Sequence, residues 1–409
     1  MGASEGSPCA ATSLDGMTDA PASAPRAVAP FAFLGSDHPM APRLARFRAA
    51  IAERAPDVPG ATVHADLTLR PDGDDGLVLH RAYWSLQSAG PDGFRATTLS
   101  YHATRDRARW LAFPEDPELP DLARLGPIEV LRYMPLRRCT FRSWWEEDGA
   151  PAIGKVKRPH RTAAAWRLLL AVHAALGDGA AGFDVAAPRG IGTPHAMFLQ
   201  TALPGDDLSD GIDLDRGPEL LRRAGALHRA MHAADVAGAP PEDPAQALRE
   251  LRADARWVAF ALPESEDTVR ATVEALERHA LDAPPAPAFC HGDLVPSQLL
   301  LDGDRFAITD FDGARIGDPH RDLAIWLAAL TFDVPALDRA VAAGDEAAIE
   351  RSEAAYLDGY GSHDARRLLW HRAAAEVHYV AVALKKDRHE PPRARRGLRI
   401  ARQCAEALA

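Results

Sequence analysis

Short apolar stretches separated by turn residues mark the first third of the chain. Between residues 60 and 115, runs such as LVLHRAYWSL and FRATTLSYHA are separated by clusters rich in Gly, Asp and Pro (RPDGDDG, AGPDG). This pattern is typical of antiparallel strands that follow one another along a sheet. We therefore expect a β-rich region ahead of the rest of the fold.

A second group of strand-like runs precedes the first clear helical pattern. The runs IEVLRYMP, RCTFRSWW and AIGKVKRP lead into TAAAWRLLLAVHAALG, where apolar residues between Ala165 and Leu176 recur at helical spacing. Such spacing predicts a helix that buries one face. The predicted order is three strands followed by a helix.

Helical patterns dominate after a last strand-like run, MFLQTALPGDDL, which ends in a Pro-Gly turn. The clearest amphipathic segments are PELLRRAGALHRAMHAAD and PAQALRELRADARWVAFAL. At the other end of the chain, residues 1 to about 30 are rich in Ala, Pro, Ser and Gly, so they bury too little apolar surface to offset chain entropy and are expected to be disordered. A β-rich half thus precedes an α-rich half.

Composition narrows the class of partner. The chain has 409 residues, of which 47% are hydrophobic, so it is long enough for two or three packed lobes. Its formal net charge of -11 argues against a nucleic-acid binder, which normally carries a positive surface to neutralise phosphates. We expect small-molecule partners and no nucleic acid.

The spacing of the cysteines and the first residues of the chain indicate in which cellular compartment the protein is expected. The four cysteines Cys9, Cys139, Cys290 and Cys404 lie far apart, without the paired spacing of zinc sites or small disulfide frameworks. The first 30 residues lack the basic opening and apolar core of a secretory signal, and no later apolar run reaches membrane-spanning length. We expect a cytoplasmic protein with no membrane partner.

The segment 289–330, FCHGDLVPSQLLLDGDRFAITDFDGARIGDPHRDLAIWLAAL, carries the candidate chemistry. Its centre predicts a hairpin, because Asp-Gly supplies the positive φ values of tight turns. A hairpin brings its ends together, so Asp293 and Gln298 before the first strand should meet Asp310 and Asp312 after the second. Carboxylates with an amide oxygen suit magnesium and nucleotide phosphates, which indicates phosphoryl transfer.

These residues also resemble a known family. His291-Gly292-Asp293, a gap of four residues, Gln298, then Asp310-Phe311-Asp312 and GDPHRDLA resemble the signature of the aminoglycoside phosphotransferase and choline-kinase-like family. That resemblance implies an α+β, bilobal protein-kinase-like fold with a β-rich N-terminal lobe, here preceded by a cap, and a mostly helical C-terminal lobe. The family usually has Asn where this chain has Gln298, but its maltokinase-like branch also carries Gln.

The resemblance assigns roles to single residues. Asp293 would be the catalytic carboxylate that orients the acceptor hydroxyl and takes its proton, while Gln298 and Asp310 would hold Mg²⁺. Lys155, in the third strand of the lobe, would contact the phosphates of ATP or GTP as co-substrate. The stretch around Thr201 and Leu203 resembles the hinge whose backbone holds the nucleotide base.

Other residues in the motifs are expected to support the site. Asp318 and Asp322 would be structural, or ordinary loop and cap carboxylates, and Asp312 is a candidate metal contact. His228, in GALHRAMH, would be a structural histidine rather than a metal ligand. With these roles the chain divides into a tail (1–30), a cap (31–127), a nucleotide-binding lobe (128–204) and a helical catalytic lobe (205–409).

Two departures from the family pattern lie in the nucleotide-binding lobe. The helix after Lys155 has no glutamate to pair with that lysine, so either another acid positions Lys155 or this lysine is held less firmly. The turn MPLRRC has no glycine for close approach of backbone N–H groups to phosphate, so Arg137 and Arg138 either contact phosphate by charge or form a solvated turn.

Two classes of function stay open. The first is an ATP- or GTP-dependent phosphotransferase that acts on a hydroxyl of an aminoglycoside-type antibiotic, sugar or amino alcohol. The second is a catalytically weak or inactive kinase-like module that only binds nucleotide. The acceptor, the choice of nucleotide, the role of the cap and the oligomeric state are not encoded in any motif.

Overall fold

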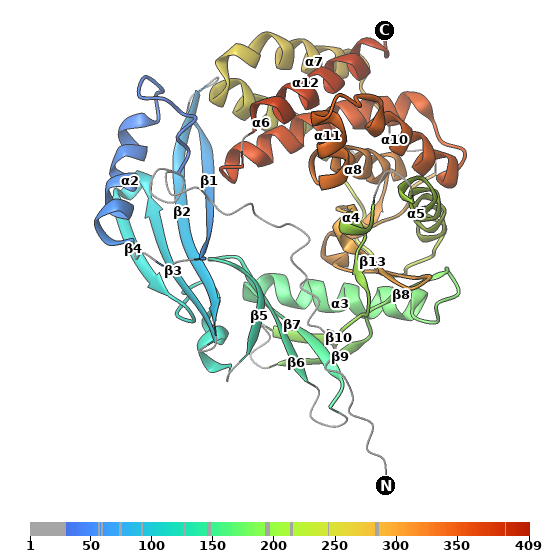
Figure 1. The fold of residues 1–409 in the computed structure, drawn as a ribbon, viewed down its shortest axis with the longest axis horizontal. Coiled ribbons are helices and arrows are strands. Elements are labelled where there is room, and N and C mark those ends of the chain that lie inside the picture. The colour runs from blue at the N-terminus through green and yellow to red at the C-terminus, as the bar shows by residue number, and fades with distance from the viewer. Residues whose placement is uncertain are drawn as a thin grey trace.

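A computed structural model places most of the chain. It describes residues 30–55, 58, 60–72, 76–90, 93–125, 128–144, 149–192, 197–212, 216–243, 245–282, 286–388 and 390–409. The tail that the sequence predicts to be disordered lies, except for Pro30, outside the described residues. Figure 1 shows the first sheet on the left and the C-terminal helices along the top and upper right.

The predicted β-rich cap is an antiparallel sheet of four strands in the order β1-β2-β3-β4. Its strands are β1 (Thr62–Asp72), β2 (Gly76–Gly90), β3 (Gly93–His102) and β4 (Arg107–Ala112). Helix α2 (Ala41–Arg54) buries Leu44, Phe47 and Ile51 against it. Because successive strand residues point to opposite faces, the face that carries Trp84 is apolar and the face that carries Tyr83 is polar.

The three strands and helix predicted next are also present. A sheet in the order β5-β6-β7-β10-β9 holds β5 (Glu129–Met134), β6 (Arg138–Trp144), β7 (Pro151–Lys157), β9 (Pro188–Gly192) and β10 (Met197–Thr201). Helix α3 (Pro159–Leu176) packs on this sheet. Its buried residues include Ala165, Leu168, Leu169, Val172 and Leu176, which is the predicted face.

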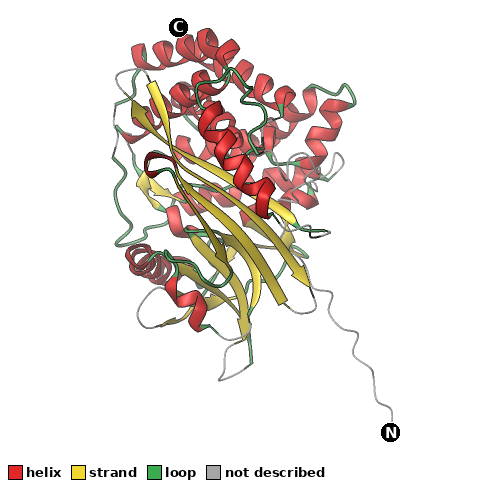
Figure 2. Cartoon of the chain, turned by 90° about the vertical axis from the view of Figure 1, so that its left-hand side faces the viewer, coloured by secondary structure: helices red, strands yellow, loops and turns green. Residues whose placement is uncertain are grey.

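The C-terminal half combines short strands with long helices. The strands are β8 (Phe183–Val185), β11 (Asp206–Asp207), β12 (Ala288–Cys290), β13 (Leu299–Asp302), β14 (Arg305–Ile308) and β15 (Arg315–Gly317). The helices are α4 (Leu208–Gly211), α5 (Gly217–His232), α6 (Gln246–Ala261), α7 (Glu266–Arg278), α8 (Pro319–Phe332), α9 (Pro335–Ala342), α10 (Ala347–Tyr360), α11 (Ala365–Lys385) and α12 (Pro391–Glu406). Seen from the side of the cap, the strands run across the lower part of the molecule and most helices lie above them (Figure 2).

The cap contacts both other regions. One continuous apolar cluster joins cap residues such as Trp84 to Trp257 of α6 and Val380 of α11. On the other side, the Gln87 side chain in β2 donates a hydrogen bond of 3.0 Å to the carbonyl of Tyr133 in β5. The cap is therefore packed against the helical half and hydrogen-bonded to the middle sheet.

The architecture is the predicted one, a mixed α+β fold in which a β-rich N-terminal part precedes a helical C-terminal part. None of the described helices combines the length and apolar character needed to cross a bilayer. Among the described residues, Cys139, Cys290 and Cys404 are free thiols.

Candidate active site

The predicted hairpin is formed by β13 and β14. Leu299 pairs with Ile308 and Asp302 with Arg305, and Gly303 in the turn has φ +59°. Beyond the paired strands, the amide of Thr309 donates a hydrogen bond of 2.9 Å to the carbonyl of Gln298. Gln298 thus lies beside the residue that precedes Asp310, so the hairpin brings the two predicted metal ligands to one edge.

Both of these residues have features that fit a hard cation. The side-chain oxygen Oε1 of Gln298 is buried and has no hydrogen-bond partner in the described part of the chain. Asp310 adopts left-handed backbone angles, φ +64° and ψ 47°, which are costly for a non-glycine residue and cluster at functional sites. An unpaired amide oxygen beside a carboxylate is a donor set that Mg²⁺ accepts.

Lys155 joins the middle sheet to this hairpin. From β7 its Nζ lies 2.8 Å from Oδ1 of Asp310 and 3.5 Å from Oδ2 of Asp312, and the lysine side chain is only 9% exposed. Burial lowers the pKa of Lys155, but the two carboxylates outweigh this effect, so the pKa lies above its ordinary value. Lys155 is therefore charged and directed at the candidate metal site.

Two further cations share these carboxylates. Arg138, at the start of β6, places a guanidinium nitrogen 3.4 Å from Oδ2 of Asp310. Lys157 forms an ion pair with Asp312, and burial lowers the pKa of Lys157 despite that partner. Burial by itself raises the pKa of Asp310, yet Lys155 and the neighbouring donors hold it well below its usual range.

Other acidic residues take the place of the glutamate that α3 lacks as a partner for Lys155. A small cavity beside Lys155 is lined from α3 by Ala165, Leu169 and Val172, none of which is acidic. The acids that position this lysine are instead Asp310 and Asp312 of the hairpin. The sequence left open whether another acid positions Lys155, and only the fold identifies Asp310 and Asp312 in that place.

Asp293 lies in the loop between β12 and β13. Its side chain is exposed to solvent, although surrounding protein and the charge of Asp310 raise the pKa of its carboxyl, and His291 opposes that shift. The loop is held by its backbone, because the amides of His291 and Gly292 donate to the carboxylate of Asp322 at 2.6 and 2.9 Å. Gly292 has φ +85°, and a Cβ there would lie 2.4 Å from the carbonyl oxygen of Gly313.

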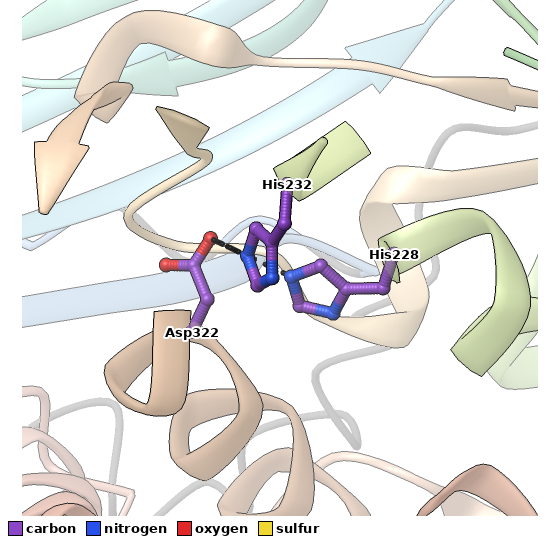
Figure 3. A group of neighbouring side chains, drawn as sticks. All are labelled: His228, His232 and Asp322. Atoms are coloured by element: carbon purple, nitrogen blue, oxygen red, sulfur yellow. Dashed lines mark hydrogen bonds and ion pairs between the residues drawn. The ribbon is translucent and has the colours of Figure 1, made fainter. Parts of the chain in front are cut away.

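Asp322 itself is fixed by two histidines from another helix. Figure 3 shows His228 and His232 of α5 pointing toward Asp322 of α8, with a nitrogen of each ring 3.5 Å from the carboxylate. The other ring nitrogens lie against the hydroxyls of Tyr356 and Tyr360. All three side chains are buried, and burial lowers the pKa of His228 to about 4.

Three ligand-type side chains this close resemble a metal site, but most of their polar atoms already have partners. The exception is Nε2 of His228, which has no hydrogen-bond partner among the described residues and lies 3.5 Å from the Asp322 carboxylate. The Asp322 carboxylate accepts two loop amides, and the histidines contact tyrosine hydroxyls. These contacts support the structural role expected of His228 and Asp322.

Asp318 also acts on helices rather than on the site. It caps α8 by accepting from the amide of His320, and it forms an ion pair of 2.6 Å with Arg367 of α11 and a contact of 3.0 Å with His371. Burial raises the pKa of Asp318, but its histidine and arginine partners lower it far below the usual range. Asp318 thus links α8 to α11.

The two hinge candidates differ in their free groups. Thr201 ends β10, where its amide donates to the carbonyl of Ala187 at 2.9 Å and its hydroxyl accepts from the amide of the same residue. Leu203 follows in the loop and packs beside Phe198, and within the described residues its amide donates to no other backbone group. Of the two, Leu203 has the backbone amide that is without a backbone partner among the described residues, whereas the amide of Thr201 is already used.

The arginines of the glycine-free turn point to different regions. Arg138 reaches Asp310, whereas Arg137 forms an ion pair of 3.2 Å with Asp66 of the cap. The contacts of Arg138 and Lys157 with the hairpin were not foreseen from the sequence. Lys157 lies two residues from Lys155 on the same strand and hence on the same face, which was the one available signal.

A model of the phosphotransferase enzyme family (APH) matches residues 137–369, which is more than half of the chain. The chain belongs to this phosphotransferase family. The match includes Lys155 and the whole hairpin, so the contacts of Lys155, Lys157 and Arg138 with Asp310 and Asp312 lie within the matched region. None of the curated proteins matches the sequence significantly.

The chain is also similar to several solved structures. A thermostable mutant of aminoglycoside phosphotransferase APH(4)-Ia is similar with a TM-score of 0.50 at 14% identity, covering 69% of this chain and 95% of that one. The macrolide 2'-phosphotransferase MphH from Brachybacterium faecium gives a TM-score of 0.42 at 22% identity, over 67% and 91% of the two chains. A choline/ethanolamine kinase family protein from Mesorhizobium loti gives 0.44 at 17% identity, over 69% and 88%.

Proposed function

We propose that this phosphotransferase moves the terminal phosphate of ATP or GTP to a hydroxyl of a small molecule. The observation that carries the proposal is the contact of 2.8 Å between Lys155 of β7 and Asp310 at the hairpin end. It joins a cation from the middle sheet to a carboxylate of the C-terminal half, across 155 positions of sequence. Phosphoryl transfer depends on such positioned charges more than on covalent chemistry.

Asp293 is the proposed catalytic carboxylate. Its exposed side chain can meet an acceptor hydroxyl, and its loop is held rigidly by the two backbone hydrogen bonds to Asp322. The crowding that raises the pKa of Asp293 makes its carboxylate a stronger base. In this role Asp293 orients the acceptor oxygen and accepts its proton as the phosphate is transferred.

Gln298 and Asp310 are the residues proposed to hold Mg²⁺. The ion, when bound, neutralises phosphate charge and keeps the transferred group in line. Lys155 and Arg138 already contact Asp310, so they are placed to pair with phosphate oxygens once a nucleotide enters. The amide of Leu203 is the proposed donor to the base.

The acceptor is proposed to be an aminoglycoside-type antibiotic, a sugar or an amino alcohol. We also propose that the cap (31–127), the nucleotide-binding lobe (128–204) and the catalytic lobe (205–409) act as three units.

The decisive experiment measures ADP or GDP release with Mg²⁺ against a panel of aminoglycosides, sugars and amino alcohols. Asp293→Ala is compared with Asp302→Ala, which removes an exposed carboxylate from the neighbouring β13–β14 hairpin. Acceptor-dependent release that falls by about 10²- to 10⁴-fold only in Asp293→Ala supports the proposal and names the acceptor class. Nucleotide binding without turnover on any acceptor would favour the kinase-like binding module instead.

A further inference from the structure

A basic cleft lies on the cap, apart from the residues discussed so far. Its volume is about 490 Å³, and it is lined by four arginines, Arg81, Arg105, Arg107 and Arg109, together with His102. It shares no lining residue with the cavity beside Lys155 and Asp310. Such a concentration of positive charge is unexpected in a chain of net charge -11.

Strand pairing explains why these side chains converge. Arg81 of β2 pairs with His102 of β3, and His102 pairs with Arg107 of β4, so the three form one row across the sheet. Arg109 lies two residues further along β4 and hence on the same face. Since strands are spaced about 4.8 Å apart, the two outer residues of the row are about 10 Å apart at the backbone, a separation that long guanidinium side chains bridge onto one anion.

The charge of these arginines is not neutralised within the described part of the chain. None of their four side chains has a hydrogen bond or ion pair with a described residue, whereas the side chain of Arg46 elsewhere on the cap pairs with Asp106. The one acidic residue in the lining, Glu118, lies 3.4 Å from Arg158. Arg81 of β2 and Arg107 of β4 thus place like charges on one face of the sheet, on either side of β3, with no carboxylate paired between them.

His102 reports the same positive potential. Burial lowers the pKa of His102, and the nearby Arg81 and Arg105 lower it further. The imidazole is therefore neutral at pH 7 and offers hydrogen bonding beside the arginines. The side chain of Ser100, paired with Arg109, adds a hydroxyl to the lining.

We propose that this cleft, built by Arg81, Arg105, Arg107 and Arg109, binds a small phosphate-bearing anion. Arginine is the side chain that best matches phosphate geometry, and the volume fits a ligand the size of a sugar phosphate. Leu136 also lines the cleft, in the same turn as Arg138, which contacts Asp310. A bound anion would therefore contact the turn that leads to the catalytic centre.

The test is isothermal titration of the full chain, without Mg²⁺ or nucleotide, with inorganic pyrophosphate and with glucose 6-phosphate. The two probes distinguish a free phosphate site from one that also accepts the organic part of an ester. Arg107→Gln/Arg109→Gln is expected to weaken binding of either probe at least about tenfold, since charge-assisted hydrogen bonds are lost. Arg81→Gln, on a different strand, repeats the test if the double variant does not fold.

Two controls keep the result specific. Arg43→Gln/Arg54→Gln removes the same charge from exposed positions of α2 and should leave binding unchanged, as should Lys155→Met in the catalytic centre. Equal loss in the α2 control would mean bulk charge alone, and loss confined to Lys155→Met would place the probe in the catalytic centre; either overturns the proposal. The proposal would also be overturned if neither probe bound. It would be overturned too if a single-stranded oligonucleotide bound more tightly than both probes and this binding depended on the cleft arginines.

Discussion

Cations occupy two contrasting environments in this phosphotransferase. At the proposed catalytic centre, Lys155, Lys157 and Arg138 all contact the carboxylates of Asp310 or Asp312. In the cap cleft, four arginines line one concave surface without an ion pair among the described residues. Both sets of residues are basic in the sequence, and only the fold shows that one set is paired with carboxylates and the other is not.

Burial explains the difference. The side chains of Lys155 and Lys157 are about one-tenth exposed, and a buried charge without a partner costs several kcal/mol. The cleft arginines Arg81, Arg107 and Arg109 are exposed, so water compensates their charge until an anion replaces it. Paired cations are thus preorganised around a site, whereas unpaired cations stay available to a ligand.

The largest expected effect is on kcat/KM, which should respond to a change at Lys155 but not to one in the cap cleft. Lys155→Met should lower kcat/KM about 10²- to 10³-fold, because a preorganised charge facing the transferred phosphate is lost. Arg107→Gln, in the cleft, should leave kcat/KM within about twofold when no anion is added. Steady-state kinetics on both variants measures this, and equal losses would show that the two clusters act as one site.

Acid should destabilise the fold through the buried His228. Because the pKa of His228 is about 4 when folded and about 6.5 when unfolded, the unfolded state binds the proton first. Stability should therefore fall by up to about 3 kcal/mol as pH falls from 6.5 to 4, and then level off. Urea unfolding across this range should show that the free energy of unfolding depends less on pH in His228→Asn than in the unsubstituted protein. The same pH dependence in both would contradict the lowered pKa of His228.

Removing one carboxylate tests how far pairing matters at the centre. Asp312→Asn takes the partner from Lys157 and one of two from Lys155. We expect kcat/KM to fall about tenfold, the worth of one hydrogen bond to a charged group. Asp302→Asn in the same hairpin is the matched control. Unchanged kinetics in Asp312→Asn would show that Asp310 alone positions the lysines.

The smallest effect is expected where a cation is paired but half exposed. Arg137 is 52% exposed and contacts Asp66 at 3.2 Å between the middle sheet and the cap. A double-mutant cycle of Arg137→Ala and Asp66→Ala should give a coupling energy of no more than about 1 kcal/mol. A coupling of several kcal/mol would mean that this pair, and not apolar packing, holds the cap in place.

Local patterns predicted the elements well. The apolar spacing between Ala165 and Leu176 predicted the buried face of α3, and Asp-Gly predicted the turn between β13 and β14. The roles of Asp293, Gln298 and Asp310 remain predictions, although the hairpin does bring Gln298 beside Asp310. The partners of Lys155 could not be read from α3, because they come from residues 155 positions away.

The sequence by itself determined the strand and helix order, the hairpin and the family motifs, because these depend on periodicity and turn chemistry within a few residues. Tertiary structure alone decided which acids hold Lys155, which histidines fix Asp322, and that Arg137 contacts the cap rather than the catalytic centre. It also decided that Arg81 and Arg107 share one face of a cleft. These outcomes depend on the packing of distant segments. The effect of a charged side chain depends on its burial and its partners, which such packing decides.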